Sequence, residues 1–253
     1  MSPAFLTRTS FERTIGLLGG TAYHTEDASQ FFPVKTPSFV DNITSILASL
    51  HIDLVVLRSS DNGVIERASE AYALPVINGG SHDDHPTQAL TDIYTLKREL
   101  GGVDGIEVAI VGRLEHRNVN ALLKGLALFS DVRVTLLPIS GQAAPEVVNY
   151  CEDRGMNLVT ATGLETVRDV DAIYLNGPRT PEHAALLRSR DSFNLKIDSE
   201  FMSMLRPHCV ILDPMQRSGG FAVEVQDPRL AFYRQAENAL FIRMALLEQM
   251  LGR

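Results

Sequence analysis

The chain is organised around the stretch Gly80-Ser81-His82-Asp83-Asp84-His85-Pro86-Thr87-Gln88-Ala89-Leu90-Thr91-Asp92-Ile93-Tyr94. Proline suits the first position of a helix, because its φ angle is fixed near the helical value and the N–H that it lacks would have no partner there. We therefore expect a helix to begin at Pro86. Apolar residues then recur at helical spacing, which predicts one buried face; they are Ala89, Leu90, Ile93, Leu96 and Leu100.

Two polar residues lie at the start of this expected helix, His85 just before it and Gln88 in its first turn. An imidazole and an amide beside a helix N-terminus can bind an anion or a polarised carbonyl group. The alternative is an ordinary capped helix with a histidine on the surface. The rest of the chain must decide between the two interpretations.

The composition excludes several classes of protein. The 253 residues are 45% hydrophobic and 21% charged, enough for a sizeable core or two small domains. No apolar run approaches the roughly 20 residues of a membrane-spanning helix, and the N-terminus lacks a signal peptide, so we expect no membrane partner and a cytoplasmic location. A net charge of -8 without a Lys/Arg stripe argues against nucleic acid, although local arginines can still bind small anions. Cys151 and Cys209 form no metal or disulfide pattern, so we expect reduced, structural thiols.

Strands and helices alternate along the chain. A first helix is expected from Ser10, as its N-cap, to Gly19, with a short strand at 21–25. The apolar strands that follow are bounded by helices, which is typical of a parallel sheet covered on both faces. Strands are expected at 53–57, 75–78, 106–111, 132–138, 157–161, 172–175 and 209–212, and helices at 38–50, 62–72, 86–100, 118–129, 144–154, 198–205 and 231–251.

The Gly-rich segment 101–105 is the best candidate for a domain boundary. The expected fold class is α/β, with two doubly wound parallel-sheet domains. The first domain would span residues 1–100 and be completed by the C-terminal helix, 231–253. The second would span residues 101–230.

Ligands of open parallel sheets bind beyond the carboxyl ends of the strands. Arg58, His85, Arg117 and Arg179 all follow expected strands, and so does the segment Pro214-Met215-Gln216-Arg217. These residues could form a shared anion site, or each arginine could be a solvated surface charge. A dinucleotide site is disfavoured, because Val111-Gly112-Arg113-Leu114-Glu115 lacks the Gly-rich turn that lets a pyrophosphate approach the backbone.

The run His85-Pro86-Thr87-Gln88-Ala89-Leu90-Thr91-Asp92-Ile93-Tyr94-Thr95 resembles a signature of the aspartate and ornithine carbamoyltransferases. The resemblance covers nearly the whole chain. Ser10-Phe11-Glu12 is similar to the start of the helix after the family's carbamoyl-phosphate loop, and Val56-Leu57-Arg58 to its strand ending in a substrate arginine. Gln235-Ala236-Glu237-Asn238-Ala239-Leu240-Phe241 resembles the final helix, which returns to the first domain. The aspartate branch is favoured, because the Ser-Met-Gly and His-Cys-Leu-Pro segments of the ornithine branch are absent.

The resemblance implies transfer of a carbamoyl group from carbamoyl phosphate to aspartate or a related amino acid, with no metal or organic cofactor. It assigns catalysis to Arg58, His85 and Thr7, and substrate binding to Arg8, Thr9, Lys35, Gln88, Arg117, Arg179 and Met215. Arg117 and Arg179 would hold the carboxylates of aspartate, although local alignment can place Gly177 at the second position, and Met215 would offer a backbone carbonyl. Lys35 lies in a loop that, in this family, reaches a neighbouring subunit's site, which implies a homotrimer with shared active sites.

The sequence departs from the family pattern at several points. The phosphate loop reads Ser-Thr-Arg-Thr-Arg in the family. Without a gap, Ala4 and Leu6 replace its serine and first arginine, whereas a two-residue deletion keeps Thr-Arg-Thr as residues 7–9. We favour the ungapped alignment. Asp213 stands where the family has histidine, and the chain is short of the family's first strand and helix. The alternatives are therefore a relative with another donor or condensation chemistry, or a catalytically silent binding or regulatory subunit.

Overall fold

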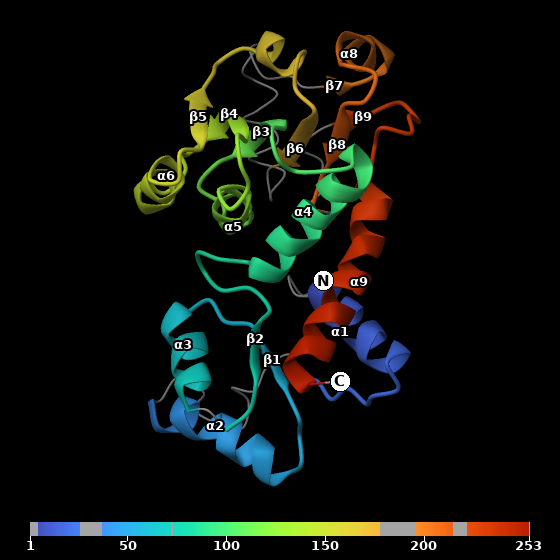
Figure 1. Cartoon of the computed structure of the whole chain (residues 1–253). Helices are drawn as coiled ribbons and strands as arrows, with labels where there is room; N and C mark the ends of the chain where they lie inside the picture. The colour runs from blue at the N-terminus through green and yellow to red at the C-terminus, as the bar shows by residue number, and fades with distance from the viewer. Residues whose placement is uncertain (1–4, 26–36, 72, 178–195, 215–221, 253) are drawn as a thin grey trace. The chain divides into compact units, whose positions relative to one another are not determined.

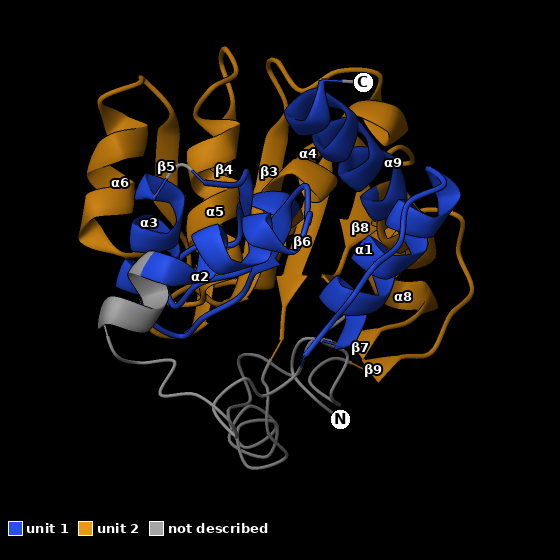
Figure 2. Ribbon diagram, turned by 90° about the horizontal axis from the view of Figure 1, so that it is seen from below, with its two compact units in different colours: residues 1–87, 239–253 blue, residues 88–238 orange. Residues whose placement is uncertain are grey.

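The computed structural model describes residues 5–25, 37–71, 73–177, 196–214 and 222–252 (Figure 1). The chain divides into two compact units, residues 1–87 with 239–253 (unit 1) and residues 88–238 (unit 2; Figure 2). Two helices, α4 (Pro86–Leu100) and α9 (Phe232–Leu251), run from one unit into the other. The division falls at the start of α4, before the Gly-rich segment 101–105, and the domain boundary expected at that segment stays a prediction.

Unit 1 contains a two-stranded parallel sheet in which β1 (Val55–Leu57) pairs with β2 (Val76–Asn78). The helices are α1 (Phe5–Leu17), α2 (Pro37–Ser49) and α3 (Asn62–Glu70). Asp61 caps α3 by accepting a hydrogen bond from the Gly63 N–H at 3.0 Å. The core joins α1, the sheet and the end of α9 through Phe11, Ile77 and Leu247. Burial of these apolar side chains stabilises the packing of α1 and the end of α9 against the sheet.

Unit 2 is built on a five-stranded sheet with the order β5-β4-β3-β6-β8, parallel throughout. A sheet of this kind is what the continuous apolar runs predict. Its strands are β3 (Glu107–Arg113), β4 (Arg133–Ser140), β5 (Asn157–Thr160), β6 (Ala172–Asn176) and β8 (Val210–Leu212). Its other elements are α5 (Arg117–Leu126), α6 (Pro145–Glu152), η2 (Leu164–Val167), α8 (Ser199–Met204) and the short parallel pair β7 (Lys196–Ile197) with β9 (Ala222–Val223).

The two faces of this sheet carry separate cores, because successive side chains of a strand point to opposite faces. From β3, Val108 and Ile110 pack with residues of α4, α5 and α6. Ala109 and Val111 pack on the other face, with residues of η2 and α8. The sheet is therefore covered on both faces, as the sequence predicts.

The structure differs from the sequence-based expectations in several places, and Leu90, expected on the buried face of α4, is 41% exposed. Ser10 is no N-cap, because α1 begins at Phe5 and the Ser10 hydroxyl donates back to the carbonyl groups of Leu6 and Thr7. Such a bond satisfies the hydroxyl inside a helix, so a serine followed by apolar residues need not mark a helix start. The strand expected at 21–25 is irregular backbone. The β7–β9 pair was missed, since each strand has only two residues.

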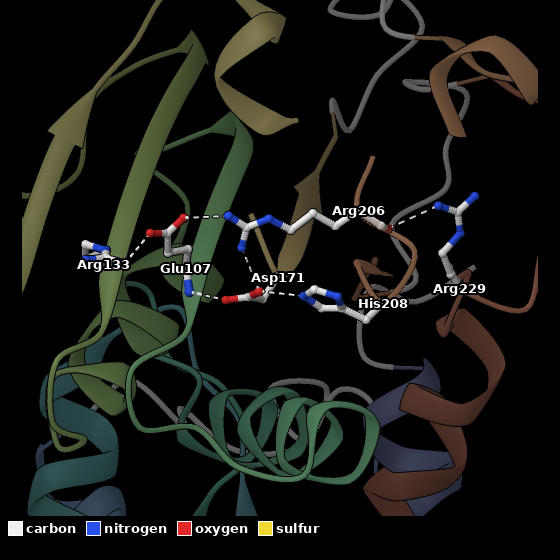
Figure 3. A network of polar contacts seen from close by, with 6 residues as sticks. All are labelled: Glu107, Arg133, Asp171, Arg206, His208 and Arg229. Carbon is white, nitrogen blue, oxygen red and sulfur yellow. Dashed lines mark hydrogen bonds and ion pairs between the residues drawn. The ribbon is translucent and has the colours of Figure 1, made fainter. Parts of the chain in front are cut away.

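A network of charged side chains joins the amino ends of the sheet strands in unit 2 (Figure 3). The Asp171 carboxylate, just before β6, accepts hydrogen bonds from the Glu107 backbone N–H, Arg206 and His208 at 2.8, 3.1 and 2.8 Å. Glu107 also pairs with Arg133 of β4. Burial raises the pKa of Asp171, but these hydrogen bonds outweigh it and lower the pKa overall. The network lies at the opposite edge from the carboxyl ends of the strands, so we assign it to holding the strands together.

Candidate active site

Arg58 follows β1 directly and contacts three segments of unit 1. Its Nη1 donates hydrogen bonds to the Gly79 carbonyl oxygen at 3.1 Å and to Thr7 Oγ1 at 3.2 Å, and lies 3.5 Å from His85 Nε2. Because β1 and β2 are parallel neighbours, their carboxyl ends bring Arg58 and the segment before His85 to one edge. The structure thus brings together Thr7, Arg58 and His85, the three residues expected to be catalytic.

The turn between β2 and α4 shapes this cluster. Gly80 has a φ of +122°, which side-chain-bearing residues rarely adopt. A Cβ atom at this position would lie 3.1 Å from Arg58 Nη1 and 3.3 Å from His85 Nε2. The Leu57 carbonyl accepts a hydrogen bond from the Gly79 N–H at 2.8 Å, which ties the turn to β1. A glycine is therefore needed for the guanidinium and the imidazole to approach each other.

His85 is a buried residue, with 5% of its surface exposed. Its backbone N–H donates to Asp84 Oδ1 at 2.8 Å, and its Nδ1 lies 3.4 Å from the Thr87 hydroxyl. The helix α4 begins at Pro86, as the sequence predicts. The alternative of an ordinary surface histidine is wrong, because the ring is enclosed between the Gly80 turn and the first turn of α4.

Gln88 and Asp92 lie one turn apart on α4. Gln88 is half-buried, and its Nε2 donates to Asp92 Oδ1 at 2.7 Å. Asp92 is fully buried, and burial raises its pKa to about 7, although hydrogen bonds from Gln235, Gln88 and Tyr174 lower it. The nearby carboxylate of Asp213 contributes to this raised value. Sequence reasoning missed Asp92. The sequence did offer an indication, because Asp92 is an acidic residue on the helix face that otherwise carries apolar residues.

Residues 7–9 lie on helix α1 rather than in a loop. Thr7 faces Arg58, Arg8 Nε lies 3.9 Å from Glu12, and Thr9 is exposed. Leu6 is half exposed, with 50% of its surface accessible. Thr7 contacts Arg58 directly, and Arg58 in turn lies against His85.

In unit 2, Arg117 is the first residue of α5 and is half-buried. His116 caps this helix, its Nδ1 accepting a hydrogen bond from the Asn118 N–H at 3.3 Å. The last residue of β6, Asn176, is fully buried and donates to the Arg113 carbonyl at 2.7 Å. Sequence reasoning missed Asn176, although it directly follows the strand expected at 172–175. Lys35, Arg179 and Met215 lie outside the described residues.

The cysteines of the described residues add no further reactive group to the site. Cys151 and Cys209 are buried free thiols, and burial raises their pKa values to about 11 and about 12. Within the described residues, no group of three His, Cys, Asp or Glu side chains could hold a metal ion. The same part of the chain contains no helix long and apolar enough to cross a membrane.

Comparison with protein-family models identifies both halves of the chain. Residues 2–98 match the carbamoyl-phosphate-binding domain of aspartate/ornithine carbamoyltransferases, and residues 104–250 match their aspartate/ornithine-binding domain. The chain belongs to the aspartate/ornithine carbamoyltransferase family.

The chain is also similar in sequence to individual curated members of the family. The chain is 33% identical over 259 residues to aspartate carbamoyltransferase 2 of Pisum sativum, covering 98% of this chain and 66% of the pea protein. It is 32% identical to the aspartate carbamoyltransferase catalytic subunit of Cellvibrio japonicus, covering 96% and 76% of the two chains. The chain thus spans about two thirds of the length of the pea relative.

The fold agrees with solved structures of this carbamoyltransferase family. Aspartate transcarbamoylase from Trypanosoma cruzi, in complex with N-(phosphonacetyl)-L-aspartic acid, matches with a TM-score of 0.83 and 28% identity. The match covers 96% of this chain and 78% of that one. The expected α/β class with two parallel-sheet domains is confirmed.

One departure from the carbamoyltransferase pattern can now be placed. Asp213 lies just beyond β8, is buried, and its backbone N–H donates to Gln235 Oε1 at 2.9 Å. This carboxylate is therefore part of the interior of unit 2, where it acts on the pKa of Asp92.

Proposed function

We propose that the protein transfers a carbamoyl group from carbamoyl phosphate to the α-amine of aspartate. The observation that carries the proposal is the cluster of Arg58, Thr7 and His85 at the carboxyl end of β1, in a chain of this family. The solved structures of the Trypanosoma cruzi relative include complexes with carbamoyl phosphate and aspartate, and with carbamoyl aspartate and phosphate. Carbamoyl aspartate belongs to pyrimidine biosynthesis, which would be the pathway of this protein.

The proposed chemistry needs positioning and positive donors rather than a nucleophilic side chain. The amine nitrogen attacks the carbonyl carbon, and a C–N bond forms. The carbonyl oxygen carries negative charge in the tetrahedral intermediate, which then releases phosphate as the C–O bond breaks and the amine loses a proton. Arg58 and His85 would donate hydrogen bonds to that oxygen, and such donors act strongly in a site that excludes water. Thr7 would hold the Arg58 guanidinium in place.

Substrate binding would involve residues of both family domains. Gln88, Arg8, Thr9 and Lys35 are proposed to bind carbamoyl phosphate, and Arg117 with Arg179 to bind the carboxylates of aspartate. The backbone carbonyl of Met215 would contact the attacking amine. These roles rest on the family resemblance, and for Lys35, Arg179 and Met215 they rest on it alone.

The direct test is incubation of the purified protein with isotope-labelled carbamoyl phosphate and a panel of amino acids. The proposal expects labelled carbamoyl aspartate and an equal amount of phosphate. Label in another amino acid would correct the acceptor, and no labelled product from any acceptor would overturn the activity.

Leu6 and Asp213 favour a second candidate function. In it, the protein either binds its ligand without catalysis or uses a donor other than carbamoyl phosphate. Leu6 offers no charge to a phosphate group, and Asp213 introduces a carboxylate. Calorimetry with carbamoyl phosphate separates the two candidates. Binding without labelled product would favour the silent relative, whereas no binding would favour a different donor.

We also propose a homotrimer in which Lys35 completes the site of a neighbouring subunit. The support is the position of Lys35 in the loop that has this role in the family. Mixing inactive Lys35→Ala and His85→Ala variants, after mild dissociation, should restore part of the activity, because some sites would receive both native residues. A monomeric mass by light scattering, or no recovery on mixing, would contradict shared sites. The cytoplasmic location remains a prediction.

A further inference from the structure

Asp92 is an ionisable residue fully buried in the middle of α4, and three side-chain donors converge on it. Its Oδ1 accepts from Gln88 Nε2 at 2.7 Å and from Gln235 Nε2 at 2.6 Å. Its Oδ2 accepts from the Tyr174 hydroxyl at 2.9 Å. A buried carboxylate is costly unless hydrogen bonds satisfy it, so this arrangement is specific rather than incidental.

The hydrogen-bond partners of Gln235 determine which way its amide group points, and this in turn determines the orientation of the Gln88 amide. Gln235 Oε1 accepts a hydrogen bond from the Asp213 backbone N–H at 2.9 Å, so its other end must be the NH2 group that faces Asp92. Oδ1 of Asp92 therefore stays an acceptor whether or not the carboxyl group is protonated, and a proton would reside on Oδ2, next to Tyr174. Consequently Gln88 also has to present its NH2 group to Asp92.

This leaves the carbonyl oxygen of Gln88 as the end of the amide that can serve a ligand. Gln88 is half-buried, and no described residue donates a hydrogen bond to its Oε1. If the amide turned over, its oxygen would meet Oδ1, and two acceptors would repel each other. Gln88 is thus held as an acceptor for an N–H group.

We propose that Asp92 is a positioning residue that makes the site specific for a carbamoyl donor, by holding Gln88 with its amide oxygen toward the NH2 group of the substrate. This inference rests on the proposed function. The carbamoyl NH2 group distinguishes carbamoyl phosphate from acetyl phosphate, which has the same carbonyl and phosphate groups but a methyl group in place of the amine. Asp92 would therefore control donor selection without touching the donor.

Three variants separate positioning from general stability. Asp92→Asn keeps an acceptor toward Gln88 and Gln235, and its NH2 group can donate to the Tyr174 oxygen, so it should retain donor affinity. Asp92→Leu has a similar volume but no acceptor. Tyr174→Phe is the matched control, because it removes one hydrogen bond of the same buried carboxylate and leaves the bond to Gln88 intact.

The expected effect of Asp92→Leu is a rise of roughly 10-fold in the KM for carbamoyl phosphate, which is the loss of one neutral hydrogen bond. The KM for aspartate should stay unchanged, and the affinity for acetyl phosphate, measured by calorimetry, should not fall. Tyr174→Phe and Asp92→Asn should keep the wild-type preference for the carbamoyl donor. Equal losses in Asp92→Leu and Tyr174→Phe, or no loss in Asp92→Leu, would overturn the proposal.

A second measurement on the wild-type protein does not depend on activity or on the folding of Asp92→Leu. The side-chain amide signals of Gln88, assigned in ¹⁵N-labelled protein with the Gln88→Met variant, should show two distinct protons that exchange slowly with water. Rapid exchange would contradict the fixed orientation. If the wild-type protein shows no carbamoyl transfer but its Gln88 amide protons exchange slowly, the proposed function is contradicted. The inference that Asp92 orients the Gln88 amide would still hold.

Discussion

The chemistry of Arg58 limits the roles that this residue can have. A guanidinium donates up to five hydrogen bonds in a fixed plane and accepts none. Thr7 and Gly79 use donors on one side of the group, which holds the plane in place. Such a preorganised donor can stabilise the charge that develops on a carbonyl oxygen without rearranging during the reaction.

Replacement of Arg58 by Gln should lower kcat by about 100- to 1000-fold, the usual cost of losing one oxyanion donor. Arg13, an exposed arginine on α1, supplies the control, and Arg13→Gln should leave kcat unchanged. Steady-state rates of carbamoyl aspartate formation measure both. An Arg58→Gln protein with wild-type kcat would remove this residue from the catalytic machinery.

The raised pKa of Asp92 predicts a dependence of stability on pH. The group has a pKa near 3.9 in an unfolded chain and about 7 in the folded protein, where burial is the main cause and the Asp213 charge adds to it. Tyr174 stays neutral, since burial raises its pKa well above the usual value. Between pH 4 and 7 the folded state holds a proton that the unfolded state has released. The stability from this group is therefore fully present below about pH 4 and lost as the pH rises through about 7.

Asp92→Asn cannot titrate, so the difference between the two proteins isolates this effect. At 1.36 kcal/mol per pKa unit, the free energy of unfolding of the variant relative to the wild type should rise by about 4 kcal/mol between pH 4 and 8. Urea unfolding at several pH values measures this difference, in which other titrating groups largely cancel. Parallel pH profiles would show that Asp92 has an ordinary pKa.

At the scale of elements, the turn between β2 and α4 decides whether the cluster forms. Gly80→Ala places a methyl group against Arg58 and His85 at a positive φ angle. We expect kcat/KM to fall by roughly 10- to 100-fold, because small displacements of positioned groups are costly. Gly102→Ala is the control, since a Cβ there has no neighbour within 4 Å and no positive φ to maintain. Equal activities would show that the turn tolerates a side chain.

The elements themselves were largely predictable from the sequence. The bounds of α4 follow from Pro86 at one end and the last apolar residue, Leu100, at the other. The parallel sheet follows from strands that are apolar on both faces. The start of α1 could not be predicted, because a serine hydroxyl can either cap a helix or donate to carbonyl groups of the preceding helical turn, as Ser10 does. The β7–β9 pair joins residues far apart in the sequence and has no local signal.

From the residues alone, the candidate site was predictable where side chains follow strands, and the family resemblance added Thr7 and Gln88, which lie on helices. Arg58 and His85 met this rule, and the structure brings them together. The environment of Asp92 could not be predicted, because Tyr174 and Gln235 reach it from other elements, and their sequence neighbours give no indication of the contact. Contacts between distant segments depend on the packing of the whole unit.

At the scale of the whole molecule, the proposed reaction needs one group of residues for carbamoyl phosphate and another for aspartate. Arg58 and His85, which are proposed to contact the carbamoyl group, belong to unit 1. Arg117, which is proposed to bind aspartate, belongs to unit 2. A ligand that carries a phosphonate and an aspartate group in one molecule tests both requirements at once. N-(phosphonacetyl)-L-aspartic acid, the ligand in the structure of the Trypanosoma cruzi relative, is such a compound.

Calorimetric titration with this bisubstrate compound is therefore the most direct test of the proposed carbamoyl transfer to aspartate. We expect one molecule to bind per chain, with wild-type affinity in Arg13→Gln and strongly reduced affinity in Arg58→Gln and Arg117→Gln. Absence of binding to the wild-type protein, or equal binding to all the variants, would contradict the account.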